Sequence, residues 1–367
     1  MLPDSFKAEI LGADEASGNI DLGRPVWVYG TGGFGTAVAR ALQAKGATVS
    51  GFVETRPAKE SWLSLPVRAA GEVKFGPDDQ LVVGIFNREA PYLDIAGVLR
   101  ETGIGSVHWP VDYYGQLADL LGSRYWLSSA SVFRDDIESI GAAYALLDDE
   151  TSRETFQRII RFRMGQDLDY SQVRHEEEQY FSHLTLPYLP KESLRYVDGG
   201  AYDGDSFRAL CSHIEPTEAY LFEPDPDNYA RLVTKVAGGS ANVRCLPLAL
   251  SDGYRILSWS DDGEGSAISE NGTNRVATAK LDDLFTNTTI DLLKLDIEGG
   301  EIDALKGAER IIREGRPVIC LSLYHKPDDL WRIPLLLASM VDDYAFHIRQ
   351  HMFNSFDSVL YAVPKSR

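Results

Sequence analysis

The segment from Tyr196 to Ser206 reads YVDGGAYDGDS and places a glycine-rich turn directly after a short apolar run. Such a turn lets a ligand approach the backbone and the start of the following helix, and it often cradles a phosphate. Here three acids, Asp198, Asp203 and Asp205, lie in or beside the turn. A carboxylate at Asp198 would repel a pyrophosphate. The turn therefore favours a ligand that carries positive charge and no phosphate.

The next predicted strand ends in Glu223, 19 residues past Gly204, where a carboxylate can accept two hydrogen bonds from ribose hydroxyls. The third strand ends in the run from Ala249 to Asp252, which includes Leu250, and an adenine ring would lie there. S-adenosylmethionine is a nucleoside with a sulfonium and an ammonium group and without phosphate. We therefore expect S-adenosylmethionine as the cofactor.

A second acidic segment, LLKLDIEGGE, runs from Leu292 to Glu301. Its apolar residues, interrupted by Lys294, indicate a buried central strand, and Asp296 would fall near the carboxyl end of that strand, beside the sulfonium site. Glu298 follows in the turn. Glu301 is most simply interpreted as an acid that stabilises the first turn of the next helix.

Transfer of a methyl group from sulfur to a hydroxyl oxygen requires positioning and removal of the hydroxyl proton. The catalytic candidates are Asp296, Glu298 and His325, the last directly after the fifth predicted strand. His347 and His351 are more simply structural or surface residues. The three catalytic candidates could also hold a divalent metal, but their spacing does not indicate one, and we predict none.

Another glycine turn, Gly30 to Gly35 (GTGGFG), also follows a strand and opens a helix, and Glu54 ends the next strand. This is the context of a dinucleotide fingerprint. However, only about four strands are predicted around it, fewer than the six of a full dinucleotide-binding fold. A turn that only maintains the fold is an equally good interpretation. Asn87 and Arg88 are the first residues expected to contact a sugar phosphate.

Strand-like and helical patterns alternate in two parts of the chain, which predicts α/β architecture with mostly parallel sheets. The second part has seven predicted strands, the last two close enough for an antiparallel edge hairpin: 195–197, 219–222, 243–248, 291–295, 317–323, 344–348 and 358–362. An insert at 255–280 has strand-like ends and predicts a further hairpin. Between the two parts, helical periodicity dominates.

These patterns predict three regions. Residues 1–115 form a smaller Rossmann-like domain, residues 116–190 a helical bridge, and residues 191–367 a seven-stranded Rossmann-like sheet that carries the cofactor.

Composition limits the partners and the compartment. The formal charge is −19, which disfavours nucleic acid and anionic lipid as partners. Three widely spaced cysteines indicate a reducing compartment, and the sequence shows neither a signal peptide nor an apolar run long enough to span a membrane. We expect a cytoplasmic protein and leave open whether it forms a homo-oligomer.

Residues from about 179 to 362 resemble the FkbM family of S-adenosylmethionine-dependent methyltransferases. The resemblance rests on the following stretches: Gln179–Phe181, Val197–Gly204, Leu221–Pro224, Ala249–Asp252, Gly265–Ser266, Thr278–Leu284 and Leu292–Glu301. It implies a class I methyltransferase sheet and usually methylation of a hydroxyl oxygen. The cofactor-binding residues it implies are Tyr180, Asp198, Gly199, Gly200, Ala201, Gly204, Glu223, Pro224, Leu250, Asp252 and Asp296.

The resemblance leaves the methyl acceptor open. Family members act on macrolides, sugars and glycans, so we expect an O-methyltransferase for a sugar, glycan or related metabolite of polysaccharide biosynthesis. The sequence around the first glycine turn is also similar to N-terminal domains of sugar-modifying enzymes, which could hold a nucleotide-sugar. Two alternatives are a nicotinamide-dependent sugar oxidoreductase or epimerase, and a non-catalytic nucleotide-sugar binding protein. The first lacks an evident catalytic pair, since Tyr113 and Tyr114 have no lysine nearby.

Overall fold

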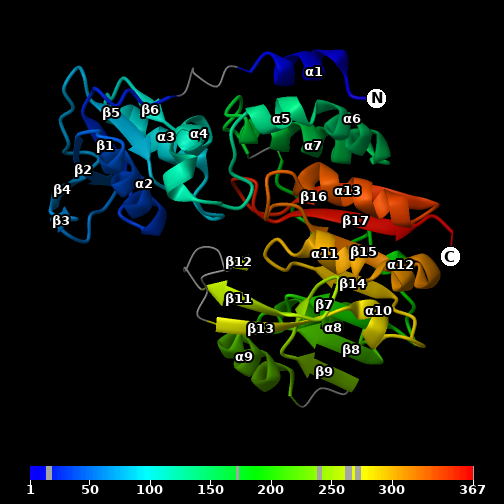
Figure 1. Cartoon of the computed structure of the whole chain (residues 1–367). Helices are drawn as coiled ribbons and strands as arrows, with labels where there is room; N and C mark the ends of the chain where they lie inside the picture. Colours follow the sequence, from blue (N-terminus) through cyan, green and yellow to red (C-terminus); the bar gives the residue numbers. More distant parts are fainter. Residues whose placement is uncertain (14–18, 171–172, 238–241, 261–266, 269–273, 367) are drawn as a thin grey trace.

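The fold consists of two α/β bodies joined by helices (Figure 1). It was obtained as a computed structural model, which describes residues 1–13, 19–170, 173–237, 242–260, 267–268 and 274–366. No helix in these ranges is long and apolar enough to cross a membrane.

The larger sheet lies in the second half of the chain, in the order β16-β17-β15-β14-β7-β8-β9. All neighbouring strands are parallel except that β17 runs antiparallel to β15 and β16. A mostly parallel sheet with an antiparallel edge pair is thus confirmed. The strands are β7 (Arg195–Gly199), β8 (Glu218–Phe222), β9 (Asn242–Leu246), β14 (Leu292–Leu295), β15 (Val318–Ser322), β16 (Tyr344–Gln350) and β17 (Ser358–Pro364).

Both faces of the central strands are buried, which explains their nearly continuous apolar sequences. Neighbouring residues such as Leu292 and Leu293 of β14 are fully buried but belong to two different apolar clusters, one on each face of the sheet. The helices of this half are α8 (Asp205–His213), α9 (Pro226–Val236), α10 (Leu281–Leu284), α11 (Glu301–Lys306), α12 (Glu309–Gly315) and α13 (Asp329–Met340).

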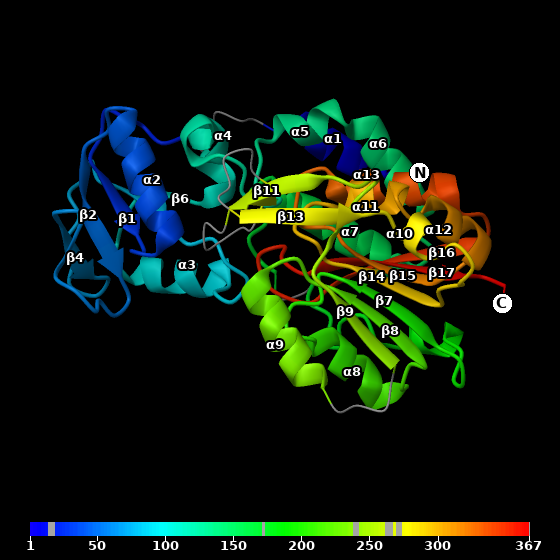
Figure 2. The same cartoon turned by 60° about the horizontal axis from the view of Figure 1, so that its bottom comes forward.

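The insert forms the predicted hairpin. β11 (Ile256–Ser260) pairs antiparallel with β13 (Asn274–Ala279), and the short strands β10 (Ala249–Leu250) and β12 (Ala267–Ile268) complete a small sheet. In both views the hairpin extends from the large sheet toward the side of the N-terminal body (Figures 1 and 2).

The N-terminal sheet has six strands in the order β3-β4-β2-β1-β5-β6. The expectation of about four strands was therefore wrong. The strands that were missed are β3 (Ser61–Trp62) and β4 (Leu65–Ala69): β3 has two residues, and β4 contains Pro66, which weakens the strand pattern. The others are β1 (Val26–Tyr29), β2 (Val49–Glu54), β5 (Gln80–Val83) and β6 (Val107–His108), with helices α2 (Gly33–Ala44), α3 (Tyr92–Glu101) and α4 (Pro110–Leu121).

Helices between the two bodies pack on the edge of the large sheet. They are α5 (Ser131–Asp135), α6 (Ile137–Leu146) and α7 (Glu150–Arg163), and α1 (Asp4–Leu11) joins them from the start of the chain (Figure 1). Asp149 caps α7 by accepting from the Ser152 N–H at 2.6 Å, and its other oxygen lies 2.6 Å from His347 Nδ1 on β16. His347 thus has the structural role expected for it. Beyond α7, the described chain contains only the short 3-10 helix η1 (Leu186–Tyr188) before β7.

Two loops join the bodies beside the carboxyl edge of the large sheet. The Asn354 side-chain amide donates to the backbone oxygens of Asn87 and Ala90, both at 2.8 Å. Arg88 Nη1 lies 3.2 Å from an Asp357 carboxylate oxygen. Asn354, Ser355 and Asp357 all have left-handed backbone angles, so the loop adopts a costly conformation that its contacts must stabilise.

Arg163, at the end of α7, is a buried connector between the helices and the large sheet. Its guanidinium donates to Ser355 Oγ at 2.8 Å, to Leu323 O at 3.1 Å and to Pro327 O at 3.3 Å. Arg163→Met would leave these buried acceptors unpaired, so we expect the free energy of unfolding to fall by about 2–4 kcal/mol. Urea unfolding measures this loss. Arg158→Met, at a half-buried position of the same helix, is the control, and equal stability of the two variants would contradict the interpretation.

Candidate cofactor and acceptor site

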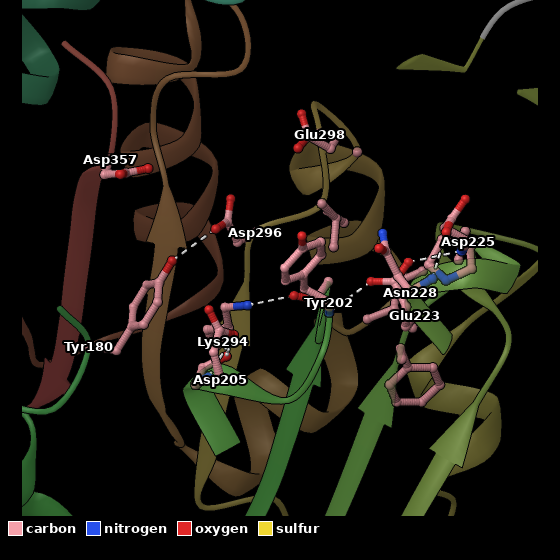
Figure 3. Close-up of a pocket in the computed structure, with 18 of the residues that line it drawn as sticks. Tyr180, Tyr202, Asp205, Glu223, Asp225, Asn228, Lys294, Asp296, Glu298 and Asp357 are labelled. Atoms are coloured by element: carbon pink, nitrogen blue, oxygen red, sulfur yellow. Dashed lines mark hydrogen bonds between the residues drawn. The ribbon is translucent and has the colours of Figure 1, made fainter. Parts of the chain in front are cut away.

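A cavity of about 720 Å³ opens at the carboxyl ends of β7, β8 and β14. The chain leaves β7 toward β8 and β9 and later returns on the other side of β7 as β14, so this position is the topological switch point where ligands bind open α/β sheets. Figure 3 shows side chains from both sides of the switch point around the cavity. Of the predicted cofactor residues, these line it: Tyr180, Gly200, Glu223, Pro224, Leu250 and Asp296.

Glu223 lies at the end of β8, as expected, and its side chain is held by the backbone. One carboxylate oxygen accepts from the Tyr202 N–H at 2.8 Å and the other from the Asp225 N–H at 2.9 Å. Each oxygen can accept a further hydrogen bond, so the carboxylate can take two hydroxyls of a ribose. Burial raises the pKa of Glu223 to about 7.

Asp198 does not line the cavity, contrary to the expectation that it faces the cofactor cation. It is fully buried beneath the glycine turn, 2.9 Å from the ammonium of Lys294, and it accepts from Ser206 Oγ at 3.0 Å. Burial alone would lower the pKa of Lys294, but Asp198 and Asp296 outweigh it and raise that pKa. Lys294 also donates to Gly200 O at 2.8 Å. The pair therefore fixes the turn from below.

The small residues of the glycine turn pack closely against their neighbours, and of them only Gly200 lines the cavity. A Cβ on Gly200 would lie 1.8 Å from the Asp296 backbone oxygen, and a Cβ on Gly199 would lie 2.7 Å from the Leu295 side chain. Ala201 is fully buried, and Gly204 has a φ of +82° at the start of α8. These small residues let the turn pack against the end of β14.

One further residue of the resemblance, Asp252, lies away from the cavity lining. Asp252 is exposed and forms an ion pair with Arg255. Gly265 and Ser266 fall outside the described residues.

Asp296 lies at the end of β14 and receives two tyrosine hydroxyls. Tyr180 donates to one carboxylate oxygen at 3.0 Å, and Tyr324 donates to the other at 3.2 Å (Figure 3 shows the first). Burial would raise the pKa of the Asp296 carboxyl, but His325 and Lys294 outweigh burial and hold it well below its usual range. Asp296 is thus a permanently charged and weakly basic group at the cavity wall.

His325 and Glu301 form a buried pair behind Asp296. His325 Nδ1 lies 2.8 Å from Glu301 Oε1, and His325 Nε2 lies 3.3 Å from Asp296 and 3.8 Å from the exposed Glu298. Burial would lower the pKa of His325, but Glu301, Asp296 and Glu298 outweigh it and raise the pKa well above its usual value. The three catalytic candidates are therefore brought together.

Glu301 lies in the first turn of α11, but it also has a partner that its sequence position did not indicate. It is fully buried, and the oxygen that faces His325 also accepts from the Ile297 N–H at 2.9 Å, so helix stabilisation is not its main contact. The signal available in the sequence was its place five residues after Asp296, at the start of the helix that follows the same turn. Asp296, Glu301 and His325 also form a group whose ligand atoms lie within 4.8 Å of one another, which is compatible with a metal ion.

The N-terminal part contributes to the same cavity. Arg88 lines it together with Asp357 and Tyr324, and the Tyr125 ring lies 6.2 Å from the Tyr324 ring and 6.0 Å from the His325 ring. This side of the cavity is therefore built from both halves of the chain.

Comparison with known proteins supports the interpretation of the larger sheet as a methyltransferase domain. Residues 198–359 match the family described as the methyltransferase FkbM domain. The whole fold is similar to the crystal structure of methyltransferase FkbM from Methylobacillus flagellatus KT, with a TM-score of 0.74, 20% sequence identity and 98% of each chain covered. At this identity the likeness shows a shared fold, and the fold expectation is confirmed. No curated protein sequence matches the chain.

Two partial likenesses are weaker. Aeropyrum pernix fibrillarin, solved with natively bound S-adenosyl-L-methionine, has a TM-score of 0.32 at 14% identity and covers 47% of this chain and 67% of its own. A putative rRNA methylase from Clostridium thermocellum has a TM-score of 0.31 at 13% identity, with 48% and 88% covered. Both likenesses are too low to indicate a function for this chain. The family match indicates S-adenosylmethionine as the cofactor, and the free acceptor capacity of Glu223 fits its ribose.

Binding of S-adenosylhomocysteine should weaken as the pH falls through about 7, because protonation of Glu223 replaces one hydroxyl acceptor by a donor. Glu223→Gln should bind about tenfold to a hundredfold more weakly and should lose this pH dependence. Calorimetric titration across that pH range measures both effects, with the exposed Glu309→Gln as control. A Glu223→Gln variant with wild-type affinity would exclude Glu223 from the cofactor site.

Asp198→Asn should lower the free energy of unfolding by about 3–5 kcal/mol, because it leaves the Lys294 ammonium buried without its anion. Adding Lys294→Met should recover part of that loss. Asp303→Asn, which breaks the exposed pair with Lys306, should cost under about 1 kcal/mol. Chemical denaturation compares the four proteins, and an equally small cost for Asp198→Asn would show that the pair does not stabilise the turn.

Proposed function

Because this chain carries a methyltransferase domain of the FkbM family, we propose that it transfers the methyl group of S-adenosylmethionine to a hydroxyl oxygen of a sugar, glycan or related metabolite. We favour oxygen as the atom that accepts the methyl group because of one observation. His325 is buried with Nδ1 held by a carboxylate and with Nε2 directed toward the cavity wall at Asp296. This is the arrangement of an oriented imidazole base, which a hydroxyl acceptor needs.

Glu223, Tyr180 and Asp296 would hold the cofactor. The two free acceptor positions of Glu223 suit the ribose hydroxyls, and the Asp296 carboxylate provides fixed negative charge at the cavity wall. When bound, S-adenosylmethionine supplies an electrophilic methyl group on a positively charged sulfur. Tyr180 and Tyr324 fix the orientation of Asp296, so little reorganisation accompanies the reaction.

His325 does not line the described cavity, so the proton of the acceptor hydroxyl would reach Nε2 through the Asp296 carboxylate, 3.3 Å away. Glu301 keeps the other ring nitrogen, Nδ1, in its hydrogen bond and stabilises the imidazolium that results. Asp296 would pass the proton on rather than keep it, because its pKa lies well below the usual range. Since the pKa of His325 is raised, the imidazole first has to lose the proton that it carries in the resting site.

The alternative of a redox reaction on the N-terminal glycine turn gains no support from the tyrosines that follow it. Tyr113 is fully buried and donates its hydroxyl to Val83 O at 2.8 Å. Tyr114 donates to Gly122 O at 2.6 Å. Neither hydroxyl is placed to exchange a proton with a ligand.

His325→Gln should lower kcat by about a hundredfold or more while S-adenosylhomocysteine still binds, because it removes the base and leaves Glu223 intact. In the wild-type protein, kcat should rise with pH through the raised pKa of His325. Glu301→Gln should shift this rise to lower pH and also lower kcat, because the charge that raises the pKa is lost.

Transfer of a labelled methyl group to a panel of sugars and polyols provides the assay. The exposed His183→Gln is the matched control. A His325→Gln variant with wild-type kcat, or methylation found on nitrogen or carbon only, would contradict the proposal.

A further inference from the structure

A second cavity, of about 350 Å³, lies in the N-terminal body, outside the residues that match the FkbM family. It opens at the carboxyl ends of β1, β2 and β5, where the strand order reverses between β1 and β5. Its polar lining includes Thr31, Glu54, Arg56 and Asn87. Like the methyltransferase cavity, it therefore lies at a topological switch point.

The glycine turn leaves bare backbone toward this cavity. Gly35 and Gly84 pack directly against neighbouring backbone atoms. A Cβ on Gly35 would lie 2.2 Å from Gly30 O, and a Cβ on Gly84 would lie 2.6 Å from the Gly35 Cα. Gly32 is different, because it lines the cavity and a Cβ there would meet no atom within 4 Å. Close packing thus explains Gly35, whereas Gly32 faces open space that a ligand can enter.

Glu54 is held in the same way as the ribose candidate Glu223. The Thr31 N–H, in the glycine turn, donates to Glu54 Oε1 at 3.2 Å, and the Thr31 hydroxyl donates to the same oxygen. In the other half of the chain, the Tyr202 N–H donates to Glu223 at 2.8 Å. In the described part of the chain, Glu54 Oε2 receives no hydrogen bond, so it can accept from a hydroxyl. In both halves of the chain, therefore, a carboxylate at a strand end is held by an N–H of the glycine turn and can accept from a ribose hydroxyl.

The two cavities meet at consecutive residues. Asn87 lines the N-terminal cavity, and Arg88 lines the methyltransferase cavity. Of the two cations in the lining of the larger cavity, Lys294 is held by Asp198, while Arg88 is half-exposed and binds Asp357 through one nitrogen, Nη1. A guanidinium with further N–H groups suits a phosphate or a sugar oxygen. One ligand could thus contact both cavities.

We propose that the N-terminal cavity holds the nucleoside diphosphate group of the methyl acceptor, whose sugar passes Arg88 toward Asp296. Glu54 accepts from the ribose, and the diphosphate lies against the bare backbone at Gly32. The acceptor is therefore a nucleotide-linked sugar, and this identification rests on the proposed methyl transfer to oxygen. Among the described residues that line the N-terminal cavity there is no imidazole held by a carboxylate, so a binding role rather than a second reaction is assigned to it.

The test is calorimetric titration of the full chain with ADP, GDP, UDP, CDP, NAD and, separately, S-adenosylhomocysteine. At least one nucleoside diphosphate should bind. Glu54→Gln should weaken that binding about tenfold or more, because a charged acceptor is lost. Gly32→Val should abolish it, since Gly32 has an extended backbone (φ −66°, ψ −178°) that valine adopts and its methyls would fill the open space.

Gly71→Val is the matched control, because Gly71 is also exposed with open space at its Cβ but does not line the cavity. All variants should bind S-adenosylhomocysteine like the wild type, which separates this inference from the proposed function. The inference is overturned if no nucleoside diphosphate binds while S-adenosylhomocysteine does, if binding survives both cavity variants, or if NAD binds more tightly than every nucleoside diphosphate. Incubation of nucleotide-sugars with labelled S-adenosylmethionine then has to give a product methylated on the sugar.

Discussion

The buried contact between Glu301 and His325 is the interaction on which the site depends. An imidazole surrounded by Asp296, Glu298 and Glu301 is stable in the interior only if it is charged or precisely hydrogen-bonded, and Glu301 provides both the charge and the geometry. Because the folded-state pKa of His325 is raised, its stabilising contribution is fully present below the unfolded pKa of about 6.5 and is lost as the pH rises through the folded value. The proposed proton transfer, which needs the neutral ring, and stability, which favours the charged ring, therefore place opposite demands on this residue.

The fold meets these demands by bringing strand ends together. Asp296 follows β14 directly, and Glu298 and Glu301 lie in and just after the next turn. Tyr324 and His325 follow the end of the neighbouring strand, β15. The loop with Asn354 and Asp357 then connects this edge to Arg88 of the N-terminal body through hydrogen bonds and an ion pair. The N-terminal body thus contributes to the lining of the large cavity, which gives a physical reason for joining two α/β sheets in one chain.

The sequence predicted the larger sheet well, because buried parallel strands are nearly continuous apolar runs and their spacing leaves little choice of topology. It also placed Glu223, Asp296 and His325 at strand ends, where parallel strands gather their side chains.

The sequence was less informative about which side chains pair with one another. Asp198 was expected to face a cation of the cofactor, but Lys294 neutralises it from the adjacent strand, and no spacing within either strand reveals that pairing. Glu301 looked like a helix-stabilising acid because His325, its partner, is far away in the sequence. β3 and β4 were missed because they are short and contain Pro66, so tertiary pairing decides their structure.

Nitrogen-15 NMR of histidine-labelled protein reports the protonation and tautomer of the His325 ring as a function of pH and tests most directly whether Nε2 takes up the proton. We expect a pKa well above about 6.5, a hydrogen-bonded proton on Nδ1 at every pH in the folded range and loss of the Nε2 proton first. In Glu301→Gln the pKa should fall. A His325 ring that titrates near its ordinary value, or that keeps its proton on Nε2 when neutral, would contradict the assignment of Nε2 as the base.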